Sequence, residues 1–220
     1  RWYALQGNVS RTDSVATLSI FADQGGNLDA PPVVSPGPVL GTATLSLSNC
    51  THALLIYQFT DGSKRFGTIP LTRLTPNVTC SPAGDNGAAA SDYLLSGNWY
   101  NPATSGQGLM FDVSPSISNL FAAWYTFKPN GQQIGGGASQ DWYTLQSNRF
   151  TPGMTSLAGI PIVQTTNGEF DNPASTDSAQ VGVANIVFQS CNAMTVSYSF
   201  TAGANKDLHG TLNLVRTGPT

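Results

Sequence analysis

Hydrophobic and polar residues alternate in several short runs along this chain, which is the pattern of strands with one buried face. In the run 194–200, for example, valine, tyrosine and phenylalanine alternate with threonine and serine. Turn signals such as Pro129-Asn130-Gly131 and Asn167-Gly168 separate the runs. The second half of the chain contains eight candidate strands, near 98–101, 108–113, 120–127, 141–146, 159–165, 183–189, 194–200 and 210–216. The pattern therefore predicts an all-β protein.

The chain contains two copies of one repeat. The segment Trp2–Gln6 recurs 140 positions later as Trp142–Gln146, and Gly26–Pro31 recurs 142 positions later as Gly168–Pro173. Further matches join Cys50 to Cys191, Tyr57 to Tyr198, Phe59 to Phe200 and Arg73 to Arg216. All offsets lie between 140 and 143, so only small loop insertions separate the copies.

The second copy opens with a stretch over 96–140 that has no counterpart in the first. We therefore expect an incomplete first β repeat over 1–80, a linker rich in Gly, Ser and Ala over 81–95, and a complete second repeat over 96–220. Both ends of the chain are expected to be processed relative to a longer precursor, because a counterpart of the first copy's last cysteine would fall just past the final residue.

Three cysteines are present, and Cys50 can pair with Cys80 as a disulfide staple at the end of the first copy. This pairing leaves Cys191 without a partner in the chain. No two cysteines form a C-x-x-C motif and only two histidines occur, so we expect no zinc site. No cofactor is expected either.

Eight consecutive antiparallel strands joined by short turns suit an up-and-down β-barrel, which closes on itself and so removes its edges. A two-sheet β-sandwich is the alternative. The first repeat, with only the later strands, would be an incomplete copy of the same barrel. We expect bulky side chains to fill the complete barrel, namely Phe111, Phe121, Tyr125, Phe127, Phe188, Tyr198 and Phe200.

The segment Gly97-Asn98-Trp99 on the first barrel strand and Arg216 on the last one together resemble the calycin pattern of lipocalins and avidins. In that family a tryptophan on strand one packs beneath an arginine from the final strand. The resemblance implies a cation–π clamp between Trp99 and Arg216 that helps to close the barrel. Arg73 would repeat the arginine in the first copy.

A second resemblance rests on two longer segments. Residues 97–108 read G-N-W-Y-N-P-A-T-S-G-Q-G, and residues 124–127 read W-Y-T-F. They resemble a family of secreted bacterial repeats with a G-x-W-Y-[ND]-P-x-x-S-G-Q-G opening and a W-Y-T-[FY] strand. The resemblance covers most of the second copy and the latter half of the first. It implies secretion and repetition, and it supplies no mechanism.

Composition agrees with an extracellular, periplasmic or cell-surface location. The chain has 22 Ser and 23 Thr but only three Lys and a single Glu, and its net charge is -3. This charge provides no basic surface for nucleic acid. No apolar run approaches the roughly 18 residues of a membrane-spanning helix, so we expect no membrane insertion.

Candidate chemistry is sparse. No nucleophile elbow or phosphate-binding loop occurs, and no spacing singles out a pair of carboxylates, so we expect no enzyme. The acidic turns near Asp29 and Asp171 are read as hairpin residues, with Ca²⁺ binding as the alternative.

Aromatic doublets are the most distinctive feature. They are Trp2-Tyr3, Trp99-Tyr100, Trp124-Tyr125 and Trp142-Tyr143. Because adjacent residues in a strand face opposite sides, one member of each doublet points out of the core. Such aromatics stack on sugar rings, bury at a protein interface or pack one repeat against the other.

These features favour a non-catalytic, extracellular structural or adhesive protein. An incomplete barrel leaves open strand edges, which a neighbouring subunit or a cleaved upstream fragment could complete, and head-to-tail donation builds a filament. The alternative is a secreted module that binds a carbohydrate or a small apolar ligand. An enzyme of unrecognised kind is a third, weaker hypothesis.

Overall fold

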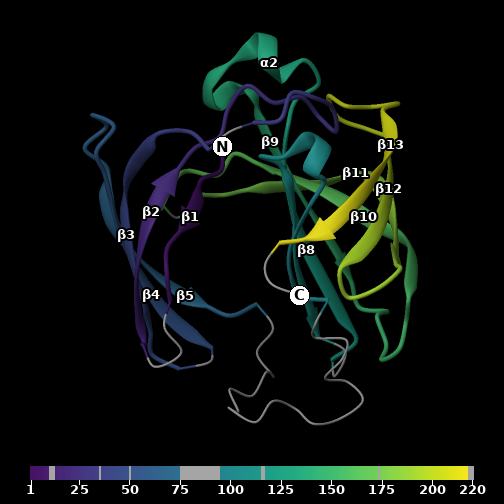
Figure 1. Ribbon diagram of the computed structural model, residues 1–220, viewed down its shortest axis with the longest axis horizontal. Helices are drawn as coiled ribbons and strands as arrows, with labels where there is room; N and C mark the ends of the chain where they lie inside the picture. Colours follow the sequence, from purple (N-terminus) through teal and green to yellow (C-terminus); the bar gives the residue numbers. More distant parts are fainter. Residues whose placement is uncertain are drawn as a thin grey trace.

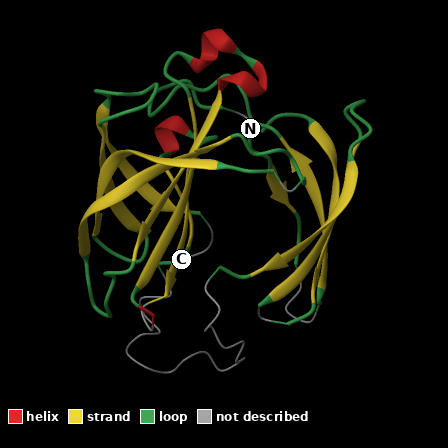
Figure 2. Cartoon of the chain, turned by 180° about the vertical axis from the view of Figure 1, so that it is seen from behind, coloured by secondary structure: helices red, strands yellow, loops and turns green. Residues whose placement is uncertain are grey.

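The computed structural model describes residues 1–9, 13–34, 36–49, 51–74, 95–114, 117–172 and 174–217. It is an all-β protein in which a closed eight-stranded antiparallel barrel lies beside a separate five-stranded antiparallel sheet (Figure 1). Figure 2 shows both units from behind, with the N-terminus between them in either view. The structure thus confirms the predicted barrel for the second repeat rather than the alternative, a two-sheet sandwich.

The five-stranded sheet comes from the first repeat. Its strands are β1 (Ala4–Gln6), β2 (Val15–Phe21), β3 (Val39–Leu47), β4 (His52–Phe59) and β5 (Phe66–Thr72). Each strand pairs with the next one along the chain, so β1 and β5 are the two edges of the sheet.

The barrel comes from the second repeat. Its strands are β6 (Gly97–Tyr100), β7 (Gly108–Ser114), β8 (Asn119–Phe127), β9 (Gln140–Ser147), β10 (Ser156–Thr166), β11 (Asp177–Phe188), β12 (Ala193–Phe200) and β13 (His209–Arg216). The 3-10 turn η1 (Pro102–Thr104) follows β6, and the short helix α2 (Gly131–Ile134) and η3 (Gly136–Ser139) connect β8 to β9. The barrel closes where β13 pairs with β6.

All eight strands predicted for the second half of the chain are present. The largest difference is at β11, which begins at Asp177 rather than at 183. Residues 177–180 are exposed and polar or small, so they show no hydrophobic alternation, yet they pair with the far end of β10. The predicted linker over 81–95 lies almost wholly outside the described residues, and the repeat boundaries on either side of it stay a prediction.

Aromatic rings fill one half of the barrel. Trp124 lies 5.6 Å from Tyr143, 5.1 Å from Tyr198 and 5.9 Å from Phe200 between ring centroids. Phe111 and Phe188 are also in this core, as predicted. The barrel is therefore filled by side chains, as eight-stranded barrels of this size permit.

The prediction was wrong about which face of β8 points inward. The inward side chains are Leu120, Ala122 and Trp124, all of which belong to the barrel core. Phe121, Tyr125 and Phe127 occupy the opposite face. Both faces of β8 are apolar because the outer face packs against the first repeat, so the alternation alone did not identify the core side.

The two repeats have matching registers. Ala43 on β3 lies opposite Tyr57 on β4, and the counterpart pair Ala184 and Tyr198 lies opposite in the same way on β11 and β12. The five-stranded sheet therefore corresponds to β9–β13 of the barrel, and the described part of the first repeat has no counterpart of β6–β8.

Candidate functional site

The inner face of the five-stranded sheet is apolar and only partly covered. Leu5, Leu47 and Leu71 are 41%, 48% and 39% exposed. Their counterparts in the barrel are Leu145, Phe188 and Leu214, which are 0%, 6% and 3% exposed. The same positions that form a closed core in the second repeat thus form an open concave surface in the first, which we call the open face.

Both edges of this sheet lack a strand partner among the described residues. The corresponding edges in the barrel are paired, β9 with β8 and β13 with β6. Unpaired edges present free backbone N–H and C=O groups to any strand that fits the register. The open face and its two edges are therefore a candidate site for strand addition.

A cleft of about 760 Å³ runs beside the β1 edge, between the first repeat and the outer wall of the barrel. One side is residues 2–6, which include β1. The other side includes Tyr100, Met110 and Tyr125, which lie on the outer surface of β6, β7 and β8. An added strand that pairs with β1 would lie in this cleft.

An aromatic cluster closes one end of the open face. Tyr3 and Phe59 lie 5.0 Å apart, and Phe170 from the second repeat lies 5.9 Å from Tyr3 and 5.8 Å from Phe59. The Arg65 guanidinium stacks 4.0 Å from the centre of the Phe59 ring. The Arg1 guanidinium lies 5.2 Å from the centre of the Tyr3 ring, so two cations stack on this cluster, which we call the aromatic mouth.

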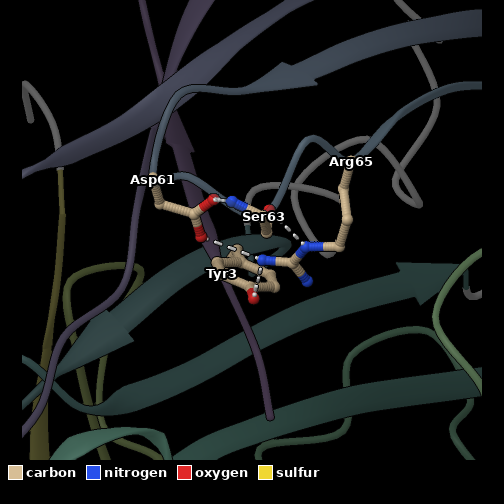
Figure 3. A network of polar contacts seen from close by, with 4 residues as sticks. All are labelled: Tyr3, Asp61, Ser63 and Arg65. Carbon is tan, nitrogen blue, oxygen red and sulfur yellow. Dashed lines mark hydrogen bonds and ion pairs between the residues drawn. The ribbon is translucent and has the colours of Figure 1, made fainter.

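Figure 3 shows how Arg65 is held in this cluster. It donates to the Tyr3 hydroxyl at 3.0 Å and to Ser63 Oγ at 2.9 Å, and it pairs with Asp61 at 3.1 Å. Hydrogen bonds from Ser63 and the pairing with Arg65 lower the pKa of Asp61. These bonds hold the Arg65 guanidinium against the rings of the aromatic mouth.

Each repeat holds one turn of the other. The Tyr57 hydroxyl of the first repeat donates to Asp171 of the second at 2.7 Å, and the Tyr198 hydroxyl of the second donates to Asp29 of the first at 3.3 Å. The hydrogen bond to Asp171 raises the pKa of Tyr57. Tyr57 matches Tyr198, and Asp29 matches Asp171. The same contact is therefore made twice, once in each direction, so the two repeats are related by an approximate two-fold axis. We call this reciprocal contact the exchange of turns.

Apolar side chains follow the same exchange. Phe170 packs into the aromatic mouth of the first repeat, while Leu28, its counterpart, packs against the barrel core of the second. Asp29 and Asp171 both have positive φ, 46° and 53°, as the turns require. The acidic turns are therefore contacts between the repeats, and the described residues contain no cluster of three metal-ligating side chains.

Burial makes Asp29 a pH-sensitive part of this contact. Burial raises the pKa of Asp29 above its ordinary value of 3.8, and the hydrogen bond from Tyr198 offsets part of this rise. The native state therefore binds a proton more tightly than the unfolded state, and stability is lost as the pH rises from 3.8 through the raised pKa.

The replacement Asp29→Asn is expected to flatten that loss, because asparagine keeps an acceptor for Tyr198 and does not ionise. Urea unfolding at closely spaced pH values gives the free energy of unfolding of the wild type and the variant as a function of pH, and the difference between the two curves measures this effect. Parallel profiles across this window would contradict the assignment.

The S-G-Q-G motif binds the first repeat's loop. Gln107 Nε2 donates to the Asn27 carbonyl at 2.8 Å, and Gln107 Oε1 accepts from the Asp29 amide at 3.3 Å and from Thr126 Oγ1 at 2.7 Å. The Val34 amide donates to the carbonyl of Ser105 in the same motif at 2.8 Å. The sequence pattern predicted no role for this motif beyond the family resemblance.

The predicted aromatic doublets are divided between the two sides of their strands, as expected. Trp124 and Tyr143 point into the barrel, and Tyr3 points onto the open face. Trp2 packs outside the barrel, 5.8 Å from both Tyr125 and Phe127.

Trp142 packs against this same outer cluster. Trp2 is anchored further by its indole N–H, which donates to the Thr126 carbonyl at 3.2 Å, and by two hydrogen bonds with the Gln140 amide. Trp2, Tyr125 and Trp142 thus pack one repeat against the other.

The predicted clamp residues meet at the barrel closure. Arg216 lies opposite Trp99 in the register of β13 and β6, and it donates to the Ser96 carbonyl at 2.9 Å. Trp99 is buried, with its indole N–H donating to Leu95 at 3.0 Å. The cation–π contact between the two stays a prediction. Arg73, the counterpart of Arg216, lies 4.0 Å from Asp112 on the barrel.

The predicted disulfide between Cys50 and Cys80 lies outside the described residues. Cys191 is exposed and has a free thiol. Comparisons of the chain with protein-family models, with curated proteins and with solved structures find no match. None of the helices in the described part of the chain has the length and apolar character needed to span a bilayer.

Proposed function

We propose that this protein is a non-catalytic, extracellular structural or adhesive module whose open five-stranded sheet is completed by strands from a neighbouring polypeptide. The supporting observation is the open face. Leucines that would be fully enclosed in a complete barrel are about half exposed there, and both edges next to them are free among the described residues. Apolar surface of this kind next to unpaired backbone favours strand addition.

Secretion or display at the cell surface is part of the same proposal. The low proportion of charged residues and the abundance of Ser and Thr support it, as does the resemblance to secreted bacterial repeats. Repetition of such units with donated strands would produce a filament or an adhesive array.

The test is the composition of the native particle. Light scattering, intact mass spectrometry and negative-stain microscopy of protein purified from its native source are expected to show particles that contain more than one polypeptide. Hydrogen exchange should show protected amides in β1 and β5 within these particles. A native particle with one polypeptide only would overturn donation by a neighbour.

The second candidate is a module that binds a carbohydrate or a small apolar ligand. The observation in its favour is the cleft of about 760 Å³, whose wall includes Tyr3, Tyr100 and Tyr125. Tyrosine rings stack on sugar rings. The filled barrel interior counts against a ligand inside the barrel itself. Screening of the purified chain against glycans and lipophilic ligands tests this candidate, and binding that a Tyr100→Ala replacement removes would favour it.

A further inference from the structure

The turn over 26–30 of the first repeat is held from two sides. On one side the Asp29 carboxylate accepts from Tyr198 inside the barrel mouth. On the other side Gln107 bonds to the backbone of Asn27 and Asp29, and the Leu28 amide donates to the Lys128 carbonyl at 3.4 Å. Residues 27–30 are accordingly half-buried. Gln107 and Lys128, which make this second set of bonds, both belong to the stretch 97–128 that contains β6–β8.

Among the residues that the structure describes, contacts to the counterpart turn over 167–172 come from one side only. It has the same local shape, with a Glu169–Asn172 bridge that matches the Asn27–Ala30 bridge. Phe170 and Asp171 contact the first repeat, as Leu28 and Asp29 contact the second. Every residue from 167 to 172 is nevertheless exposed. The side on which Gln107 would lie in the matching arrangement is open to solvent.

Gly26 and Gly168, at matching positions in the two turns, differ in how closely they are covered. A methyl group on Gly26 would lie 2.3 Å from the Phe127 ring, because that ring covers the glycine. A methyl group on Gly168, the counterpart, would meet nothing closer than Thr176 Cγ2 at 3.5 Å, an ordinary van der Waals contact. The space that Phe127 fills above the first turn is empty above the second.

Trp142 agrees with this picture. Its counterpart Trp2 is 8% exposed because it packs on Tyr125 and Phe127 of β8. Trp142 is only half-buried. Under the approximate two-fold relation, the ring that would cover Trp142 belongs to a strand of the β8 type paired with β1.

We infer that the polypeptide that completes the open face carries three strands of the β6–β8 type together with an S-G-Q-G turn, and that its glutamine and its phenylalanine close over the exposed turn at 167–172. This inference rests on the strand completion proposed above and names the partner's chemistry. The partner recognises both repeats at once, since its strands bind the first and its turn binds the second.

The barrel supplies the expected register. In β8 and β9, Ala122 lies opposite Leu145 and Trp124 lies opposite Tyr143. The incoming strand therefore places a small residue opposite Leu5 and a tryptophan opposite Tyr3, within the cleft beside β1. At the other edge, the G-x-W tryptophan of the partner lies opposite Arg73, as Trp99 lies opposite Arg216.

The probe for this inference is the chain's own segment 95–140, joined directly in front of Arg1 of the full chain. This junction keeps the natural spacing, because Gln140 precedes Asp141, the counterpart of Arg1. In this extended chain, amides of β1 and β5 are expected to exchange at least about tenfold more slowly than in the original chain. The midpoint of thermal unfolding is expected to rise.

The decisive variant is Gly168→Ala, tested in both chains. In the original chain it is expected to leave the unfolding midpoint unchanged, because the added methyl makes only an ordinary van der Waals contact with Thr176. In the extended chain it is expected to reverse most of the added protection, since the methyl would overlap the phenylalanine ring. Gly26→Ala in the original chain is the matched control. The Phe127 ring already covers Gly26 there, so the added methyl would overlap that ring. Gln107→Ala, made only in the added copy of the segment, should weaken the extended chain in the same way.

The outcomes separate the two proposals. If the extension leaves β1 and β5 unprotected while the barrel amides stay protected, completion of the open face by such strands fails, and the clamp fails with it. If the extension protects both edges but Gly168→Ala and the added Gln107→Ala change nothing, completion stands and the clamp over 167–172 is overturned.

Discussion

Replacing Trp124 with alanine is expected to lower the free energy of unfolding of the barrel by about 3–5 kcal/mol. The indole is fully enclosed and touches the rings of Tyr143, Tyr198 and Phe200, which come from two further strands of the barrel. The replacement leaves a large cavity, because closed barrel strands cannot collapse around it. Urea unfolding followed by circular dichroism measures the change.

Trp142→Ala is the matched control for this prediction. Trp142 is on the neighbouring strand but lies outside the barrel and is only half-buried, so its removal should cost about 1 kcal/mol. Equal losses for the two tryptophans would contradict the placement of Trp124 as the centre of the core.

Lysine at two matched positions should separate folding from assembly. Leu145→Lys is expected to unfold the barrel, because an unpaired ammonium at this enclosed position costs about 4 kcal/mol or more. Leu5→Lys, its counterpart on the open face, should change the stability of the chain by no more than about 1 kcal/mol, since its side chain reaches water. In a completed assembly, however, position 5 becomes enclosed, so Leu5→Lys should abolish assembly.

Two measurements check this pair. Chemical unfolding reports the stability of each variant chain, and light scattering with negative-stain microscopy reports the native particle. If Leu5→Lys assembles as the wild type does, the open face is not the assembly surface. If Leu145→Lys retains a cooperative transition of unchanged midpoint, the correspondence between the two repeats is wrong.

The strands of the barrel could be predicted from the sequence because short alternating runs were bounded by glycine, proline and asparagine turns. The repeat strengthened the prediction, since Tyr57 and Phe59 recur as Tyr198 and Phe200. The inward face of β8 could not be predicted. Phe121, Tyr125 and Phe127 looked like core residues, but Tyr125 and Phe127 pack against Trp2 outside the barrel. Alternation identifies two faces and does not say what covers each.

The exchange of turns was also out of reach of the sequence. In the sequence, Gly26–Pro31 and its counterpart have the pattern of ordinary hairpin residues, and the S-G-Q-G motif indicates only a family resemblance. A signal was present, because both copies retain aspartate at matching positions, 29 and 171. Interpreting it required knowing that each aspartate reaches a tyrosine in the other copy, which is a contact between residues more than a hundred positions apart.

The reciprocal pairs formed by Tyr57 with Asp171 and by Tyr198 with Asp29 constrain how the molecule can grow. This interface is isologous, because each repeat contributes the same contact to the other. Such an interface is complete once two repeats have met, as in a closed dimer. Both tyrosine–aspartate pairs are used within one chain. Under the strand addition proposed above, further growth would use a directional contact between unlike surfaces, namely the open face of the five-stranded sheet and the donated strands. Under that proposal the molecule would combine a self-limiting joint with an extendable one, and the length unit of a fibre would be one pair of repeats.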